Sequence, residues 1–207
     1  MNKTNTMKTI KIYNDNIAEN QLEEVKETLQ AGGIIVIPTD TLYAVACDAL
    51  NPKAIERVCK IKGINPEKTN LSILCDDISM VSDYAKFDNY AFKLMKDNTP
   101  GPFTFLFRAA SSLPRAFKGR KIVGIRIPDN EAVRKIIENL GNPLLSTSIL
   151  YKDEDYAVNP DLIEEEYSDK ADLMIKGDEG QLQPSAIVDC TSSTPEIIRE
   201  GPIALKE

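Results

Sequence analysis

Histidine is absent from this chain of 207 residues. Its absence excludes a catalytic triad with an imidazole base, a histidine general base and any metal site with histidine ligands. Cysteine is scarce, and none of the four cysteines lies in a CxxC pair or at another metal-ligand spacing; they are Cys47, Cys59, Cys75 and Cys190. We therefore expect four reduced core residues and no metal site.

The chain also lacks long apolar runs and the glycine-rich loops of common nucleotide-binding folds. No run approaches the ~20 residues of a membrane helix, and residues 1–8 lack the apolar segment of a signal peptide. Neither a Walker loop nor a GxGxxG motif occurs, which argues against a P-loop NTPase and a dinucleotide-binding enzyme. We expect a cytoplasmic protein with no membrane partner.

Charge is unevenly distributed along the chain. The net charge of −7 argues against a protein that coats nucleic acid with its whole surface. The segment from Arg108 to Arg126 nevertheless contains six basic residues and no acidic residue, whereas residues 151–170 contain eight acidic and two basic residues. Two interpretations stay open: a locally positive surface, or a solvated basic loop beside an acidic helix.

Apolar periodicity predicts a mixture of strands and helices. The β-branched run at residues 34–37, bounded by glycine and proline, predicts a strand buried on both faces. Helices are expected near residues 16–32, 52–60, 76–84, 88–96, 130–140 and 161–166, the first and fifth capped by Asp15 and Asp129. Further strands are expected at residues 9–13, 71–75, 103–107, 122–127, 144–147, 172–175, 186–188 and 197–199.

These elements predict an α/β fold class. We expect a single domain over residues 1–207, with an open, twisted, mixed β-sheet flanked by helices. Ligands of such sheets bind in crevices beyond the strand ends, so a cleft is expected at the strand exits.

Polar residues stand at several of these exits. Thr39 and Tyr43 follow the buried strand at residues 34–37, although Thr39 has the alternative of bonding its own backbone in a turn. Arg126 lies within an apolar strand run, where an unpaired guanidinium would be costly to bury. We therefore expect Arg126 to line a cleft or to face a carboxylate or a phosphate.

Seven ordered segments resemble the YrdC family, the threonylcarbamoyl-AMP synthases. They extend from about Ala31 to Gly201 and read GGIIVIPTDTLYAVACDA, KIKG, TPGPFTF, GIRIPD, NPLLSTS, PSAIVD and IIREGPI. The stretches AFKLMKDNTPG and PLLSTS and the closing REG look most like the YciO branch of the family. The resemblance implies a YrdC/RibB-like fold.

The resemblance also implies an activity, that of a nucleotidyltransferase which uses L-threonine, bicarbonate and ATP with Mg²⁺. Such an enzyme releases pyrophosphate and makes threonylcarbamoyl-AMP for tRNA modification. Its attacking carbamate oxygen is already anionic, so a chain without histidine is suited to the reaction. By the resemblance, Lys62 and Arg126 would be catalytic, and Lys62, Ser148 and Arg199 would contact ATP. The residues that would bind threonine or line its cleft are Thr39, Tyr43, Thr104, Ser146 and Ser185.

Two positions depart from the family pattern. The family's Lys-x-Arg pair lacks its arginine here, because Ile64 stands two residues after Lys62. Its Ser-x-Asn pair lacks the asparagine, because Leu150 stands two residues after Ser148. Loss of a phosphate-binding guanidinium alone would slow the reaction by roughly 10²-fold or more.

Two hypotheses therefore compete. One is a threonylcarbamoyl-AMP synthase of low activity. The other is a non-catalytic protein that binds double-stranded RNA, tRNA or the ribosome and retains the cleft. The second would place Arg115, Lys118, Arg120 and Lys121 against phosphates, and its binding would be salt-sensitive.

Overall fold

The computed structural model describes residues 6–65, 72–113, 121–149 and 158–206. The described strands are β1 (Lys8–Lys11), β2 (Ile35–Ile37), β3 (Ala44–Asp48), β4 (Ser72–Leu74), β5 (Ala85–Lys86), β6 (Phe103–Ala109), β7 (Ile122–Arg126), β8 (Leu144–Ser148), β9 (Leu173–Lys176), β10 (Ala186–Asp189) and β11 (Glu196–Arg199). The described helices are α1 (Glu19–Gln30), α2 (Pro52–Lys62), α3 (Ile78–Tyr84), α4 (Asn89–Asn98), α5 (Glu131–Leu140) and α7 (Pro160–Tyr167). None of these helices is long and apolar enough to span a bilayer.

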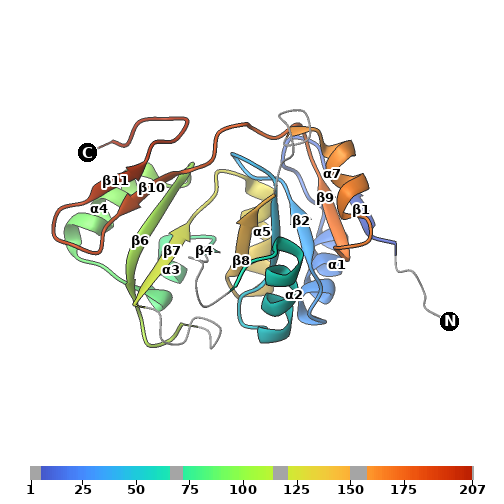
Figure 1. Ribbon diagram of the computed structural model, residues 1–207, viewed down its shortest axis with the longest axis horizontal. Helices are drawn as coiled ribbons and strands as arrows, with labels where there is room; N and C mark the ends of the chain where they lie inside the picture. Colours follow the sequence, from blue (N-terminus) through green and yellow to red (C-terminus); the bar gives the residue numbers. More distant parts are fainter. Residues whose placement is uncertain (1–5, 66–71, 114–120, 150–157, 207) are drawn as a thin grey trace.

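One mixed sheet runs through the molecule in the order β1-β9-β2-β3-β8-β4-β7-β6-β10-β11, and β5 pairs with β6. The sheet contains parallel pairs such as β4–β7 and β6–β10 and antiparallel pairs such as β3–β8 and β6–β7. Figure 1 shows β6, β7, β10 and β11 with α4 in one half of the molecule, and β1, β2 and β9 with α1 and α7 in the other. The expected α/β fold with an open mixed sheet is therefore confirmed.

The larger apolar core covers one face of the sheet from β9 to β10. Val45, Leu145, Ile73, Ile125 and Phe105 belong to it from five successive strands. Buried residues of α2, α3, α4 and α7 pack against them. This face is closed by helices, so it offers little room for a ligand.

The opposite face is covered over only part of its width. Ile35, Ala46 and Leu74 form a second core there with buried residues of α1 and α5. Among the described residues, β6, β7, β10 and β11 contribute nothing to this core. The part of the face beyond β4 thus stays outside the helical cover, and it is there that the polar strand residues lie.

Two details of the expected secondary structure are wrong. Strand β3 is missing from the expected strands, because its small residues follow a polar turn without a clear boundary. The expected caps are also shifted. Ala18 precedes α1, while Asp15 lies in the turn before it with φ 54° and accepts a hydrogen bond of 2.7 Å from Asn130 Nδ2. Asn130, rather than Asp129, caps α5 by accepting from the Val133 N–H at 3.0 Å.

A buried asparagine attaches the C-terminal segment to the body of the molecule. Asn98, the last residue of α4, donates from Nδ2 to the Lys206 carbonyl at 2.8 Å and accepts from the Lys206 N–H at 2.8 Å. The same amide donates to the Leu94 carbonyl at 2.7 Å. Gly201, between β11 and Lys206, lies against β10. A Cβ atom on Gly201 would be 2.4 Å from the backbone nitrogen of Ala186.

We expect Asn98→Ala to lower the free energy of unfolding by about 1–3 kcal/mol, because it leaves buried backbone partners without hydrogen bonds. The measurement is urea denaturation of the wild type and the variant. The control is Asn89→Ala, an exposed position at the start of the same helix. If the two variants are equally stable, the attachment through Asn98 contributes nothing to the fold.

Candidate functional site

A hydrogen-bonded turn at residues 38–43 follows β2. Thr39 Oγ1 donates to the Leu42 carbonyl at 2.7 Å and accepts from the Thr41 N–H at 3.1 Å. The Thr41 carbonyl accepts from the Gln181 N–H at 2.8 Å, which ties the turn to the segment before β10. Thr39 therefore makes the backbone bonds that its residue type favours in turns.

Arg126, at the end of β7, reaches this turn. Its Nη1 donates to Thr41 Oγ1 at 2.9 Å, and its Nη2 forms an ion pair with Asp40 Oδ1. Arg126 is 8% exposed. The expected carboxylate partner of this buried arginine is thus Asp40, which comes from the turn.

The twist of the sheet explains this contact between distant strands. β2 and β7 are separated by β3, β8 and β4 and run in opposite directions through the ladder. Adjacent strands of a sheet are rotated relative to one another by ~20–25°, so β2 and β7, four strand positions apart, are rotated by ~80–100°. Their ends therefore approach each other across this face of the sheet.

A second polar group comes from β6, the residue before β10, and β11. Thr104 Oγ1 and Ser185 Oγ are 2.8 Å apart and share a hydrogen bond. Arg199 donates from Nε at 3.0 Å and from Nη2 at 2.7 Å to the Ser185 carbonyl. Burial lowers the pKa of Arg126, Asp40 opposes this effect, and the charge of Arg199 lowers the pKa further. Arg199 therefore adds positive charge to the surroundings of Arg126.

Small residues form the surface between these groups and β8. Ser146 pairs with Ser72, and Ser72 pairs with Gly124, so all three share one face of the sheet. A Cβ atom on Gly124 would lie 2.6 Å from Ser72 Oγ and 3.4 Å from Thr104 Cγ2. Gly124 is not among the predicted site residues, although a glycine within a strand often marks such a close approach and is the signal that could have found it.

Lys62 and Ser148 form a separate contact. Lys62 is the last residue of α2, which ends because Gly63 adopts φ 63°. Lys62 Nζ donates to the carbonyl of Ser148 at the end of β8. Burial lowers the pKa of Lys62 to about 8. Ile64, which stands at the family's arginine position, packs against the larger core.

Tyr43 lies in the core beneath the turn and is 0% exposed. Its hydroxyl donates to the Asp178 carbonyl at 2.9 Å and accepts from the Gly177 N–H at 3.1 Å. Burial raises the pKa of Tyr43 to about 12. In this structure Tyr43 therefore connects the turn to the end of β9 instead of facing solvent.

The expected RNA-binding residues fall largely outside the described ranges. Arg115, Lys118 and Arg120 lie there, whereas Lys121 is described and exposed. The structure adds Lys86 and Arg108, which are paired across β5 and β6. Both line a hollow of about 400 Å³ together with Phe87, Asp88, Cys190, Thr191, Ser192 and Ser193.

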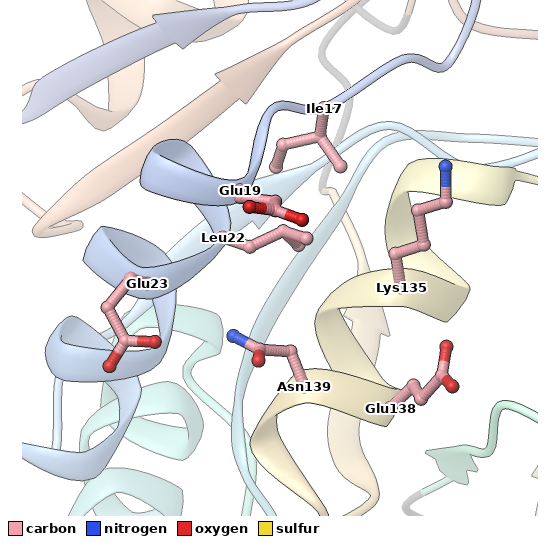
Figure 2. A pocket seen from close by; sticks show the side chains of 7 residues that line it. All are labelled: Ile17, Glu19, Leu22, Glu23, Lys135, Glu138 and Asn139. Carbon is pink, nitrogen blue, oxygen red and sulfur yellow. The ribbon is translucent and has the colours of Figure 1, made fainter.

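A larger hollow, of about 640 Å³, lies between α1 and α5 and contains none of the predicted site residues. Figure 2 shows Glu19 and Glu23 on one side of it and Lys135 and Glu138 on the other. Three carboxylates against one ammonium group repel phosphates, so this hollow is unsuited to a nucleotide.

The pKa of Lys62 predicts a pH effect on stability. The folded protein releases this proton near pH 8 and the unfolded chain near 10.5, so the free energy of unfolding rises with pH between these values. We expect Lys62→Met to remove this rise. The measurement is urea denaturation from pH 7 to 10, with Lys60→Met, exposed on the same helix, as the control. An unchanged pH profile in Lys62→Met would contradict the assignment.

Comparisons with known proteins identify the relatives of this chain. The Sua5–YciO–YrdC family model, described as "Telomere recombination", matches residues 27–201. The uncharacterized protein YciO of Escherichia coli K12 is 36% identical over 193 residues, which cover 92% of this chain and 93% of YciO. A Methanocaldococcus jannaschii protein named "Putative threonylcarbamoyl-AMP synthase" is 32% identical over 203 residues, which cover 97% of this chain and 96% of that protein.

Solved structures agree with these relatives. The crystal structure of E. coli YciO superimposes with a TM-score of 0.88 at 34% identity and covers 97% of this chain and 98% of YciO. The structure of P. abyssi Sua5 complexed with L-threonine has a TM-score of 0.84 at 24% identity and covers 93% of this chain but 57% of Sua5. The chain described here belongs to the Sua5–YciO–YrdC family.

Proposed function

We propose that this protein binds L-threonine and ATP and adenylates threonylcarbamate. The observation that carries the proposal is the contact of Arg126 with Thr41, in the turn that also contains Thr39. The group of Thr104, Ser185 and Arg199 supplies further hydroxyl groups and a second guanidinium. Segments far apart in the chain bring two guanidinium groups and several hydroxyl groups to one part of the sheet face. The M. jannaschii relative, whose name gives this reaction, supports the proposal at 32% identity.

The proposed reaction needs positioned charge rather than a protein base. Threonine and bicarbonate condense to a carbamate with loss of water, and a carbamate oxygen then attacks the α-phosphorus of ATP. A new P–O bond forms, the bond to the β-phosphate oxygen breaks, and pyrophosphate leaves with the electron pair. Cations around the α-phosphate stabilise the added negative charge in the transition state.

We assign roles to the site residues on this basis. Thr39, Arg126, Ser146 and Ser185 contact threonine, and Tyr43 and Thr104 support the walls of its site. Lys62, Ser148 and Arg199 contact the nucleotide, with Lys62 and Arg126 stabilising charge during the reaction.

Mg²⁺ enters this scheme with the triphosphate. Within the described ranges, no cluster of three or more Cys, Asp or Glu residues is placed to hold a metal ion. The phosphates of ATP would therefore supply most of its ligands, as Mg²⁺ sites on nucleotides commonly do.

The direct test incubates the protein with L-threonine, bicarbonate, ATP and Mg²⁺ and quantifies pyrophosphate and threonylcarbamoyl-AMP. We expect slow formation of both products in equal amounts, because Ile64 replaces an arginine of the catalytic pair. We expect Arg126→Met to abolish it. Product at the level of a protein-free control would contradict the proposal.

Lys62 gives a second prediction, on nucleotide affinity. We expect Lys62→Ala to weaken ATP binding by about tenfold, which corresponds to one charge-assisted hydrogen bond. ATP affinity of the wild type should also fall as the pH rises from 7 to 9, because Lys62 loses its proton near pH 8. Isothermal titration calorimetry of both proteins, with Lys60→Ala as the control, measures both effects. Equal affinity in wild type and Lys62→Ala would remove Lys62 from the site.

Binding to structured RNA is the second candidate function. The observation in its favour is the clustering of Lys86, Arg108 and Lys121 on β5, β6 and the entry to β7, on a protein of net charge −7. Like charges directly opposite on two strands destabilise a sheet. Lys86 and Arg108 are such a pair, and a bound phosphate would relieve their repulsion.

We expect the triple variant Lys86→Ala, Arg108→Ala and Lys121→Ala to weaken binding to tRNA. The slope of log affinity against log salt should fall by about 0.7–0.9 for each phosphate that the variant no longer neutralises. The matched control replaces three lysines elsewhere, Lys11, Lys53 and Lys135, with alanine. Equal slopes in the two triple variants would exclude this surface, and absence of RNA binding by the wild type would exclude the function.

A further inference from the structure

The ion pair between Asp40 and Arg126 is buried but only half satisfied. The two side chains are 12% and 9% exposed. An arginine commonly binds a carboxylate through two parallel hydrogen bonds. Here Nη2 contacts Oδ1, while Arg126 Nε and Asp40 Oδ2 are both buried without a hydrogen-bond partner. A buried polar group without a hydrogen-bond partner is unfavourable, so Asp40 satisfies Arg126 incompletely.

The surroundings of this pair carry a surplus of positive charge. Arg199 acts electrostatically on Arg126, and Asp40 is the carboxylate that opposes it. Asp40 pairs with Arg126, whereas Arg199 donates to the Ser185 carbonyl and adds positive charge nearby. A second carboxylate is attracted to such a cluster.

Separation of Asp40 from Arg126 would leave the other contacts of the site in place. It lies in a turn rather than in a strand or helix. Thr41 holds Arg126 Nη1 through its hydroxyl at 2.9 Å and is itself attached to Gln181 through its carbonyl at 2.8 Å. Release of Asp40 would keep both of these bonds.

We propose that Asp40 occupies, in the ligand-free protein, the place on Arg126 that the carboxylate of the bound ligand takes, so that binding exchanges one carboxylate for another. No covalent bond changes in this step. The identification of the ligand as L-threonine rests on the proposed function, whereas the exchange itself requires only a carboxylate. Asp40 thereby sets the affinity for the ligand, because each ligand molecule must displace it.

The exchange is tested by Asp40→Asn, which removes the charge and keeps the shape of the side chain. L-Threonine should bind this variant about tenfold more tightly than the wild type, because its carboxylate no longer competes with a resident charge. L-Threonine amide, which lacks the carboxylate, should show no such gain. The control Glu131→Gln removes an exposed carboxylate paired with Lys135 and should leave both affinities unchanged. Equal or weaker threonine binding by Asp40→Asn overturns the inference, because a residue that merely holds Arg126 in place would weaken binding when removed.

A second arm separates this inference from the proposed function. Sodium formate, compared with sodium chloride at the same ionic strength, should raise the melting temperature of Asp40→Asn more than that of the wild type, and should not raise that of a variant that also carries Arg126→Met. If threonine binds neither protein and formate stabilises Asp40→Asn, the exchange stands and the proposed function fails. Absence of a formate effect overturns the exchange.

If Asp40→Asn does not fold, hydrogen exchange of the wild-type protein tests the inference instead. Binding of L-threonine, or of formate if threonine does not bind, should speed exchange of the backbone amides at residues 40–42, because the turn loses its ion pair. Slower or unchanged exchange there overturns the inference.

Discussion

The buried guanidinium of Arg126 is the constraint on which the candidate site depends. A cation that is 8% exposed cannot stay in a folded protein without partners, and its partners come from a turn 85 residues earlier in the chain. Because Thr41 and Asp40 supply them, the turn after β2 is held against the end of β7. This contact places the turn that contains Thr39 beside the part of the sheet face that the second core does not reach.

The sheet makes the contact possible in two ways. Its twist brings the ends of β2 and β7 together although three strands separate them. Its second core stops at β4, so the face over β7, β6 and β10 keeps polar and small residues such as Thr104 and Gly124 where a helix would otherwise pack. The larger apolar core lies on the opposite face, where α2, α3, α4 and α7 pack against the strands.

Much of the fold could be predicted from the sequence, because continuous β-branched runs and helical apolar spacing are local signals. Strand β3 could not, since its small residues carry no such signal. At the site, the unfavourable free energy of burying an unpaired arginine predicted that Arg126 would line a cleft or face a carboxylate or a phosphate. The sequence could not indicate Asp40 as that carboxylate, or Lys86 as the neighbour of Arg108, because both pairings depend on strand order and twist.

The central claim is that the face around Arg126 binds an amino acid beside a nucleotide. A crystal structure of the protein with L-threonine and a non-hydrolysable ATP analogue tests it most directly. The account predicts the threonine carboxylate on the Arg126 guanidinium, Asp40 turned away, and the phosphates near Lys62 and Arg199. Ligand density elsewhere, such as between α1 and α5, or threonine bound with Asp40 still on Arg126, would contradict it.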